Sequence, residues 1–164
     1  MKKIFVSMML AFLTFADIAA QDVYTEIRSK ATEQIGDPLV NDVVKQINRF
    51  KVDALDYMLI KMREQMPDST ATFLDKQALA MNNFVSLYLK KVLEYRTMPQ
   101  AQQVKILKAF MDASYSNSLF NDPDNELTLG YYVNDDCLTR FSLDTDWRRA
   151  YLAANAMLKK IEGK

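Results

Sequence analysis

Glycine and proline, the residues that most often interrupt helices, are scarce in this chain. Only three glycines and four prolines occur among its 164 residues. Gly36 and Gly130 are the glycines inside the chain, and Gly163 stands next to its last residue. Because each interruption costs helical stability and there are so few of them, the sequence favours a mainly α protein built from long helices.

Apolar residues recur every three or four positions along most of the chain, which is the periodicity of a helix with one buried face. The pattern predicts helices over about residues 22–35, 38–66 and 72–96, a fourth that begins at Pro99, and a last one after Asp144. The third of these helices is apolar on two sides, so we expect it at the centre of a bundle.

The expected helix ends rest on residues that satisfy terminal backbone groups. Gly36 is expected to end the first helix in a left-handed conformation, with Asp37 as the N-cap of the second helix and Pro38 as its first residue. Thr72 followed by Asp75 resembles a capping box at the start of the third helix. These patterns predict where the chain changes direction.

The sequence changes character after Phe120. Residues 121–125 are rich in Asn, Asp and Pro and predict a loop. Residues 127–133 then alternate apolar with polar or small side chains, as strands do, and residues 137–142 offer a returning strand. The sequence predicts either a β-hairpin or an irregular segment here. Asp144 is the expected N-cap of the last helix, whose apolar stripe comprises Trp147, Ala150, Tyr151, Ala154, Leu158 and Ile161.

The N-terminus has the order of a secretory signal peptide. Lys2 and Lys3 precede an apolar run from Ile4 to Ala16, and after Asp17 and Ile18 the segment ends in the small residues Ala19 and Ala20. The run is shorter than the roughly 20 apolar residues that span a membrane, although an uncleaved N-terminal anchor is the alternative. We therefore expect residues 1–20 to be a signal peptide.

The remainder of the chain, residues 21–164, is expected to fold as a single helical domain of about five helices. No second apolar stretch of spanning length occurs in it. The mature protein is therefore expected in the periplasm or outside the cell, with no membrane span.

Composition excludes several classes of function. The chain has no histidine and one cysteine, which excludes a Ser/His/Asp triad, His metal sites, Cys-rich zinc sites and an internal disulfide. Basic and acidic residues are equal at 21 each, so no charge excess favours nucleic acid as a partner. Cys137 is expected to be a small buried residue, with a reactive thiol or an intermolecular disulfide as the alternatives. The sequence contains no recognisable catalytic motif, and we expect neither a cofactor nor a metal ion to be bound.

Acidic residues gather between positions 122 and 146. Asp122, Asp124 and Glu126 have the spacing of calcium ligands, but Leu127 and Val133 stand where an EF-hand needs Gly and Glu. We therefore interpret this stretch as a turn. A carboxylate-based hydrolase or a metal-dependent enzyme that uses these acids is the alternative function.

Aromatic residues are densest just before and within the last helix. Tyr and Trp are favoured at interfaces because they combine a large apolar area with a polar group. A candidate binding surface therefore comprises Tyr131, Tyr132, Phe141, Trp147, Arg148 and Tyr151. The alternative is that Trp147 and Tyr151 simply belong to the core.

Two segments carry a resemblance to other proteins. The N-terminal segment that ends in Ala-Ala-Gln and the segment Phe141–Trp147, FSLDTDW, resemble small exported helical proteins of unassigned function from Bacteroidetes-type bacteria. The resemblance implies export from a Gram-negative cytoplasm and brings no activity. The expected function is a non-catalytic module that binds a protein partner in the cell envelope or a small ligand.

N-terminal sequencing of the native protein tests the predicted export. We expect the mature chain to begin at Gln21, after cleavage behind Ala20, with Asp22 as the second choice. A native cytoplasmic chain that begins at Met1 would contradict the signal-peptide prediction.

Overall fold

A computed structural model describes residues 22–95, 97–123, 128–134 and 137–163 of the chain. For residue 95 and for residues 128–134 and 137–139, only the backbone is described. The predicted signal peptide, residues 1–20, lies outside the described residues.

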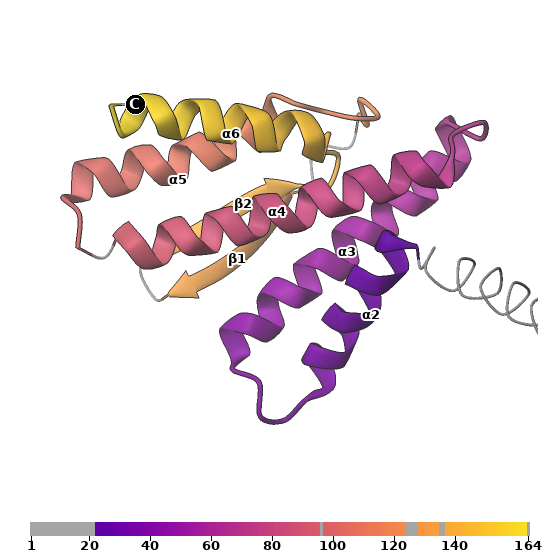
Figure 1. The fold of residues 1–164 in the computed structure, drawn as a ribbon, viewed down its shortest axis with the longest axis horizontal. Helices are drawn as coiled ribbons and strands as arrows, with labels where there is room; N and C mark the ends of the chain where they lie inside the picture. Colours follow the sequence, from indigo (N-terminus) through magenta and orange to yellow (C-terminus); the bar gives the residue numbers. More distant parts are fainter. Residues whose placement is uncertain (1–21, 96, 124–127, 135–136, 164) are drawn as a thin grey trace, which may run out of the picture.

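The described residues form five helices and a β-hairpin (Figure 1). The mainly α fold is therefore confirmed, with the strands immediately before the last helix. None of the described helices is both long and apolar enough to cross a membrane. The elements are α2 (Val23–Gly36), α3 (Asp42–Gln65), α4 (Ala71–Tyr95), α5 (Gln100–Tyr115), β1 (Thr128–Asn134), β2 (Cys137–Ser142) and α6 (Trp147–Ile161).

The hairpin pairs β1 and β2 in antiparallel register. Leu129 lies opposite Phe141 and Tyr131 opposite Thr139, and the register shifts between Tyr132 and Asn134. A two-stranded hairpin is marginal when isolated. Here β1 contacts α3 and β2 contacts α5, so helices support both strands, and the segment is a hairpin and not an irregular loop.

Helix α4 is the centre of the bundle, as its two apolar sides predict. It runs across the middle of the molecule with α5 and α6 on one side and α2 and α3 on the other (Figure 1). Its fully buried residues include Ala78, Met81 and Phe84. A helix that contacts four others must be apolar over most of its circumference, which explains the pattern in its sequence.

Four aromatic rings from four elements form the middle of the core. Phe84 of α4 lies 5.2 Å from Phe141 of β2 and 5.5 Å from Trp147 of α6, measured between ring centroids. Phe50 of α3 lies 5.6 Å from Phe141 and 5.7 Å from Trp147. Most of these pairs meet edge to face, the arrangement that ring quadrupoles favour. The cluster joins α3, α4, β2 and α6.

The predicted boundary between the first two helices is wrong in detail. Gly36 is the last residue of α2 and has no positive φ. Asp37 accepts a hydrogen bond from the backbone N–H of Leu39 at 2.8 Å, and therefore caps a turn that contains Pro38. Helix α3 begins only at Asp42, with Asn41 as its N-cap. Because the carboxylate of Asp37 already accepts a hydrogen bond within the turn, it does not cap α3, and α3 begins at a later residue.

Two other predicted caps have different roles. At the start of α4, the hydroxyl of Thr70, and not that of Thr72, accepts a hydrogen bond from the backbone N–H of Phe73. The carboxylate of Asp75 instead accepts a hydrogen bond of 2.9 Å from the backbone N–H of Tyr24 on α2. Likewise Asp146, and not Asp144, caps α6. In both cases the predicted capping residue forms long-range hydrogen bonds that sequence spacing does not indicate.

Helix α6 is held by polar contacts as well as by its apolar stripe. Gln77 of α4 is 1% exposed and donates to Asp146 Oδ1 at 3.0 Å, so it fixes the start of α6. Ser114 of α5 and Thr145 share a hydrogen bond of 2.8 Å. The start of α6 is therefore bonded to both neighbouring helices.

Trp147→Ala is expected to destabilise the fold strongly. Trp147 is 0% exposed, and its Nε1 has no hydrogen-bond partner among the described residues. Loss of a large buried aromatic side chain costs about 3–5 kcal/mol. Thermal unfolding should show a large drop in Tm, and wild-type tryptophan emission should be blue-shifted.

Leu152→Ala is the matched control, because Leu152 lies on the same helix and is 68% exposed. We expect its effect to stay within about 0.5 kcal/mol. Equal melting of Trp147→Ala and wild type would contradict the buried position of Trp147.

Candidate functional site

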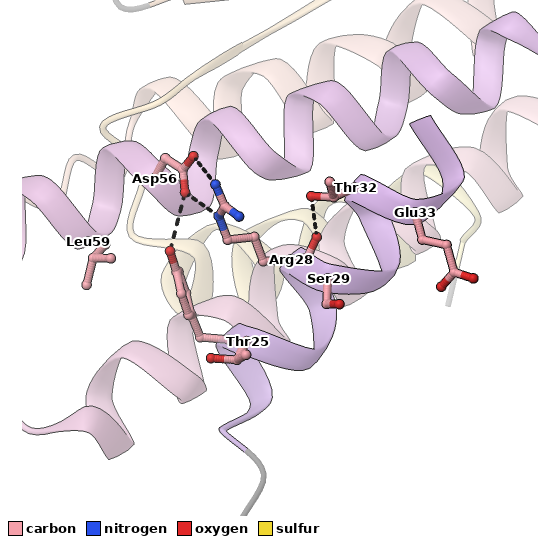
Figure 2. Close-up of a pocket in the computed structure, with 8 residues that line it drawn as sticks. Thr25, Arg28, Ser29, Thr32, Glu33, Asp56 and Leu59 are labelled. Carbon is pink, nitrogen blue, oxygen red and sulfur yellow. Dashed lines mark hydrogen bonds and ion pairs between the residues drawn. The ribbon is translucent and has the colours of Figure 1, made fainter. Parts of the chain in front are cut away.

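A recess of about 660 Å³ lies between α2 and α3 (Figure 2). Small-molecule sites typically enclose about 300–1,000 Å³. Three of its lining side chains, Thr25, Ser29 and Thr32, carry aliphatic hydroxyls on α2. The remaining lining residues are Tyr24, Arg28, Glu33, Asp56 and Leu59.

An ion pair between the two helices forms one wall of this recess. Arg28 Nε donates to Asp56 Oδ1 at 2.6 Å and Nη2 donates to Oδ2 at 2.8 Å. Tyr24 adds its hydroxyl to Asp56 Oδ1 at 3.3 Å. Figure 2 shows the guanidinium of Arg28 directed from α2 toward Asp56 on α3. A bidentate pair of this kind fixes both position and orientation.

The contacts make these groups poor at proton transfer. The hydrogen bond from Arg28 holds the pKa of Asp56 below its ordinary value. Burial, together with the Asp56 charge, raises the pKa of Tyr24. Asp56 is therefore a weaker base and Tyr24 a weaker acid than usual. Because general catalysis needs a pKa near the working pH, the arrangement suits hydrogen bonding better than acid–base chemistry.

Two carboxyl groups position the start of α2 next to this recess. The backbone N–H of Tyr24 lies 3.1 Å from Asp22 Oδ1 and 2.9 Å from Asp75 Oδ1. Burial, and the hydrogen bond with Asp22, raise the pKa of Asp75, while the same hydrogen bond lowers the pKa of Asp22. The Asp22–Asp75 pair therefore shares one proton more readily than two isolated carboxyl groups would bind one. Asp75 fastens α2 to α4 at this point.

The structure separates the aromatic residues of the candidate binding surface. Phe141 and Trp147 are buried at 3% and 0% exposure, so they belong to the core and not to an exposed surface. Arg148 is exposed and Tyr151 is half-buried on α6. The backbones of Tyr131 and Tyr132 lie in β1, and their side chains lie outside the description.

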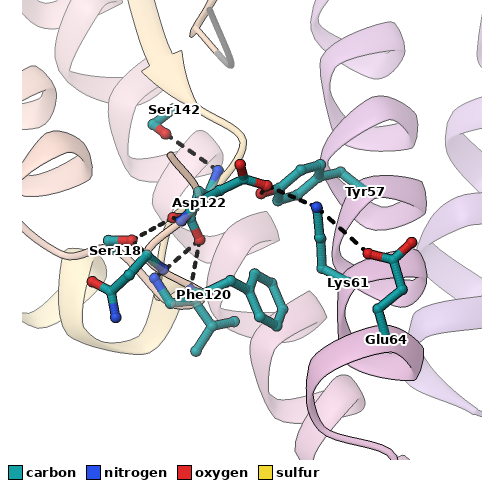
Figure 3. Close-up of polar contacts among 10 residues, drawn as sticks. Tyr57, Lys61, Glu64, Ser118, Phe120, Asp122 and Ser142 are labelled. Carbon is teal, nitrogen blue, oxygen red and sulfur yellow. Dashed lines mark hydrogen bonds and ion pairs between the residues drawn. The ribbon is translucent and has the colours of Figure 1, made fainter. Parts of the chain in front are cut away.

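Two described carboxylates of the acidic region have structural partners (Figure 3). Asp144 is 5% exposed and accepts from Ser118 Oγ and from three backbone N–H groups, those of Leu119, Phe120 and Asp122. Asp144 thereby orders the loop that follows α5. Its carboxylate oxygens are occupied by donors of the same chain.

Asp122 bridges that loop to α3. Its Oδ2 accepts from Tyr57 Oη at 3.0 Å and forms an ion pair with Lys61 Nζ at 2.8 Å. Lys61 in turn lies 3.5 Å from Glu64 (Figure 3). The hydrogen bond and ion pair with Asp122 raise the pKa of Lys61. Asp122 is therefore a link between two segments, where the sequence predicted a solvated turn.

Among the described residues, no three acidic or cysteine side chains come close enough together to hold a metal ion. Asp124, Glu126, Asp135 and Asp136 of the acidic region lie outside the described residues. Cys137 lies at the start of β2, where only the backbone is described.

Sequence reasoning missed the recess beside α2. Tyr24, Arg28 and Thr32 stand four residues apart and so share one face of the helix, which is the one local signal. Nothing in the spacing pairs Arg28 with Asp56, because the two residues meet only when α2 packs on α3.

Comparisons with known proteins give no relative to argue from. No protein-family model, no curated protein and no solved structure matches the chain.

The Arg28–Asp56 pair predicts a specific pH dependence of stability. The folded-state pKa of Asp56 is lowered, so its stabilising contribution is present above the unfolded pKa of about 3.9 and is lost as the pH falls through the folded value. Both side chains are about 40% exposed, so Asp56→Asn should cost less than about 1 kcal/mol near neutral pH. Urea unfolding at a series of pH values measures the difference.

We expect the difference between wild type and Asp56→Asn to shrink toward about pH 3. Asp112→Asn, which removes an exposed pair with Lys108 within α5, is the control and should have a smaller effect. A difference that stays constant down to acid pH would contradict a stabilising charge on Asp56.

Proposed function

We propose that this chain is an exported, non-catalytic module that binds a protein partner or a small ligand in the cell envelope. The observation that carries the proposal is the recess of about 660 Å³ between α2 and α3. Its wall is organised by the Arg28–Asp56 pair before any ligand arrives. Organised polar groups lower the entropic cost of binding.

The chemistry of the recess favours a polar partner. The hydroxyls of Thr25 and Ser29 lie on exposed residues of α2, and such groups both donate and accept hydrogen bonds. Arg28 keeps 40% of its side chain exposed although it is paired with Asp56. Leu59 adds a short apolar surface. The recess thus offers several weak directional contacts on a pair of packed helices.

Two described carboxylates of the acidic region, those of Asp122 and Asp144, are engaged in contacts within the chain. A hydrolase that uses two carboxylates needs both of them free to face a substrate. Asp144 has its oxygens bonded to the loop after α5, and Asp122 is bonded to Tyr57 and Lys61. These two acids contribute to folding, so among the residues that the structure describes no observation favours the carboxylate-based alternative.

Site-specific photo-crosslinking in cells tests the proposal. A photoreactive residue at Ser29 should capture a partner in the envelope, or the purified protein should release a bound small molecule detectable by mass spectrometry. Arg28→Met should abolish either signal by disordering the wall of the recess. The matched control places the photoreactive residue at Lys105, an exposed residue of α5.

Capture at Lys105 equal to that at Ser29, or signals that survive in Arg28→Met, would contradict a binding site at the α2–α3 recess. Recovery of the protein only in the cytoplasm would contradict the exported location independently of the recess.

A further inference from the structure

A second recess lies on the opposite side of α2. It has a volume of about 340 Å³ and is formed by α2, α3 and α4. Its lining residues on α2 differ from those of the α2–α3 recess. It is therefore a separate site, and its volume suits a small ligand.

Lys51 of α3 supplies the cationic group of this recess. Its Nζ donates to Asn82 Oδ1 of α4 at 2.8 Å. No carboxylate of the described residues forms an ion pair with it, and burial alone lowers the pKa of Lys51. A half-buried ammonium group that has only a neutral amide partner is costly to desolvate. An anion in the recess would remove that cost.

The neighbouring polar groups are neutral or already paired. Asn48 is 3% exposed, and its Nδ2 donates to Gln34 Oε1 at 2.7 Å. The charged residues Glu26 and Lys30 also line the recess, and they form an ion pair with each other along α2. Amide groups therefore surround Lys51 and offer hydrogen bonds without supplying a compensating negative charge.

The remaining wall is apolar. Ile27 and Ala31 contribute from α2, and Leu79 contributes from α4 with 48% of its surface exposed. A large exposed aliphatic side chain at the mouth of a polar recess gains from contact with an apolar ligand group. The recess thus combines the ammonium group of Lys51, the Glu26–Lys30 ion pair, several amides and one aliphatic side.

We propose that this recess binds a small organic carboxylate, with the carboxylate on Lys51 and Asn82 and the aliphatic body against Leu79 and Ile27. The proposal does not depend on the α2–α3 recess, because the two sites share no lining residue. A structural role for the ammonium group of Lys51 is a poor explanation, since a half-buried charge without an ionic partner contributes little to the stability of a fold. Residues kept at a cost to stability are typical of binding sites.

An NMR titration of the purified, ¹⁵N-labelled protein with sodium hexanoate tests the proposal, with 1-hexanol as the uncharged probe of the same length. We expect saturable shifts at the backbone amides of Lys51 and Asn82 with hexanoate. Hexanol should bind at least about tenfold more weakly, because it forms no charge-assisted hydrogen bond.

Lys51→Met keeps the aliphatic stem and removes the charge, so it should weaken hexanoate binding by about tenfold or more. Its Tm should equal or exceed that of wild type, because a costly buried charge is gone. Lys159→Met, on an exposed residue near the end of α6, is the matched control and should leave the titration unchanged.

Any of four results would overturn the proposal. The first is the absence of saturable shifts at about millimolar hexanoate, the weakest affinity expected for a specific small ligand. The second is equal binding of hexanol and hexanoate. The third is unchanged hexanoate binding by Lys51→Met. The fourth is a clear drop in Tm for Lys51→Met, which would assign Lys51 to holding α3 against α4 through Asn82.

Discussion

The fold depends on one cluster of aromatic rings at the meeting point of four elements. Phe50, Phe84, Phe141 and Trp147 come from α3, α4, β2 and α6, and each ring contacts at least two others. Edge-to-face contacts restrict both the distance and the angle between elements. The cluster therefore fixes how the hairpin and the last helix sit on the central helix, and the polar contacts around it only refine that arrangement.

Local periodicity predicted the helices because it reports burial directly. Helix α4 is apolar on two sides because it contacts helices on two sides, and this information is present in its own sequence. The helix ends were harder to predict. Asp75 and Asp144 have the spacing of caps, yet their carboxylates bond to residues of α2 and of the loop after α5. An acidic residue that caps its own helix and one that bonds to a donor far along the chain have the same spacing in the sequence, so the sequence alone does not distinguish them.

The candidate sites were largely hidden from the sequence for a similar reason. Arg28 and Asp56, like Lys51 and Asn82, are brought together only by packing of different helices, and a single sequence carries no signal of that pairing. The high density of aromatic residues in the sequence was informative, but it indicated a buried core and not a binding surface. Phe141 and Trp147 stand out in the sequence because the core needs large rings. Composition thus indicated the core more clearly than it indicated any surface.

The position of the aromatic cluster along the chain has a consequence for how the protein folds. Phe141 and Trp147 stand in the last quarter of the chain, and the partners of both rings stand far earlier, on α3 and α4. Helices α2 to α5 can therefore form while the centre of the bundle still lacks two of its largest rings. Contacts that join distant parts of the sequence form late, since loop closure costs entropy. A chain that closes its core last cannot complete its folding until its C-terminal quarter has been synthesised.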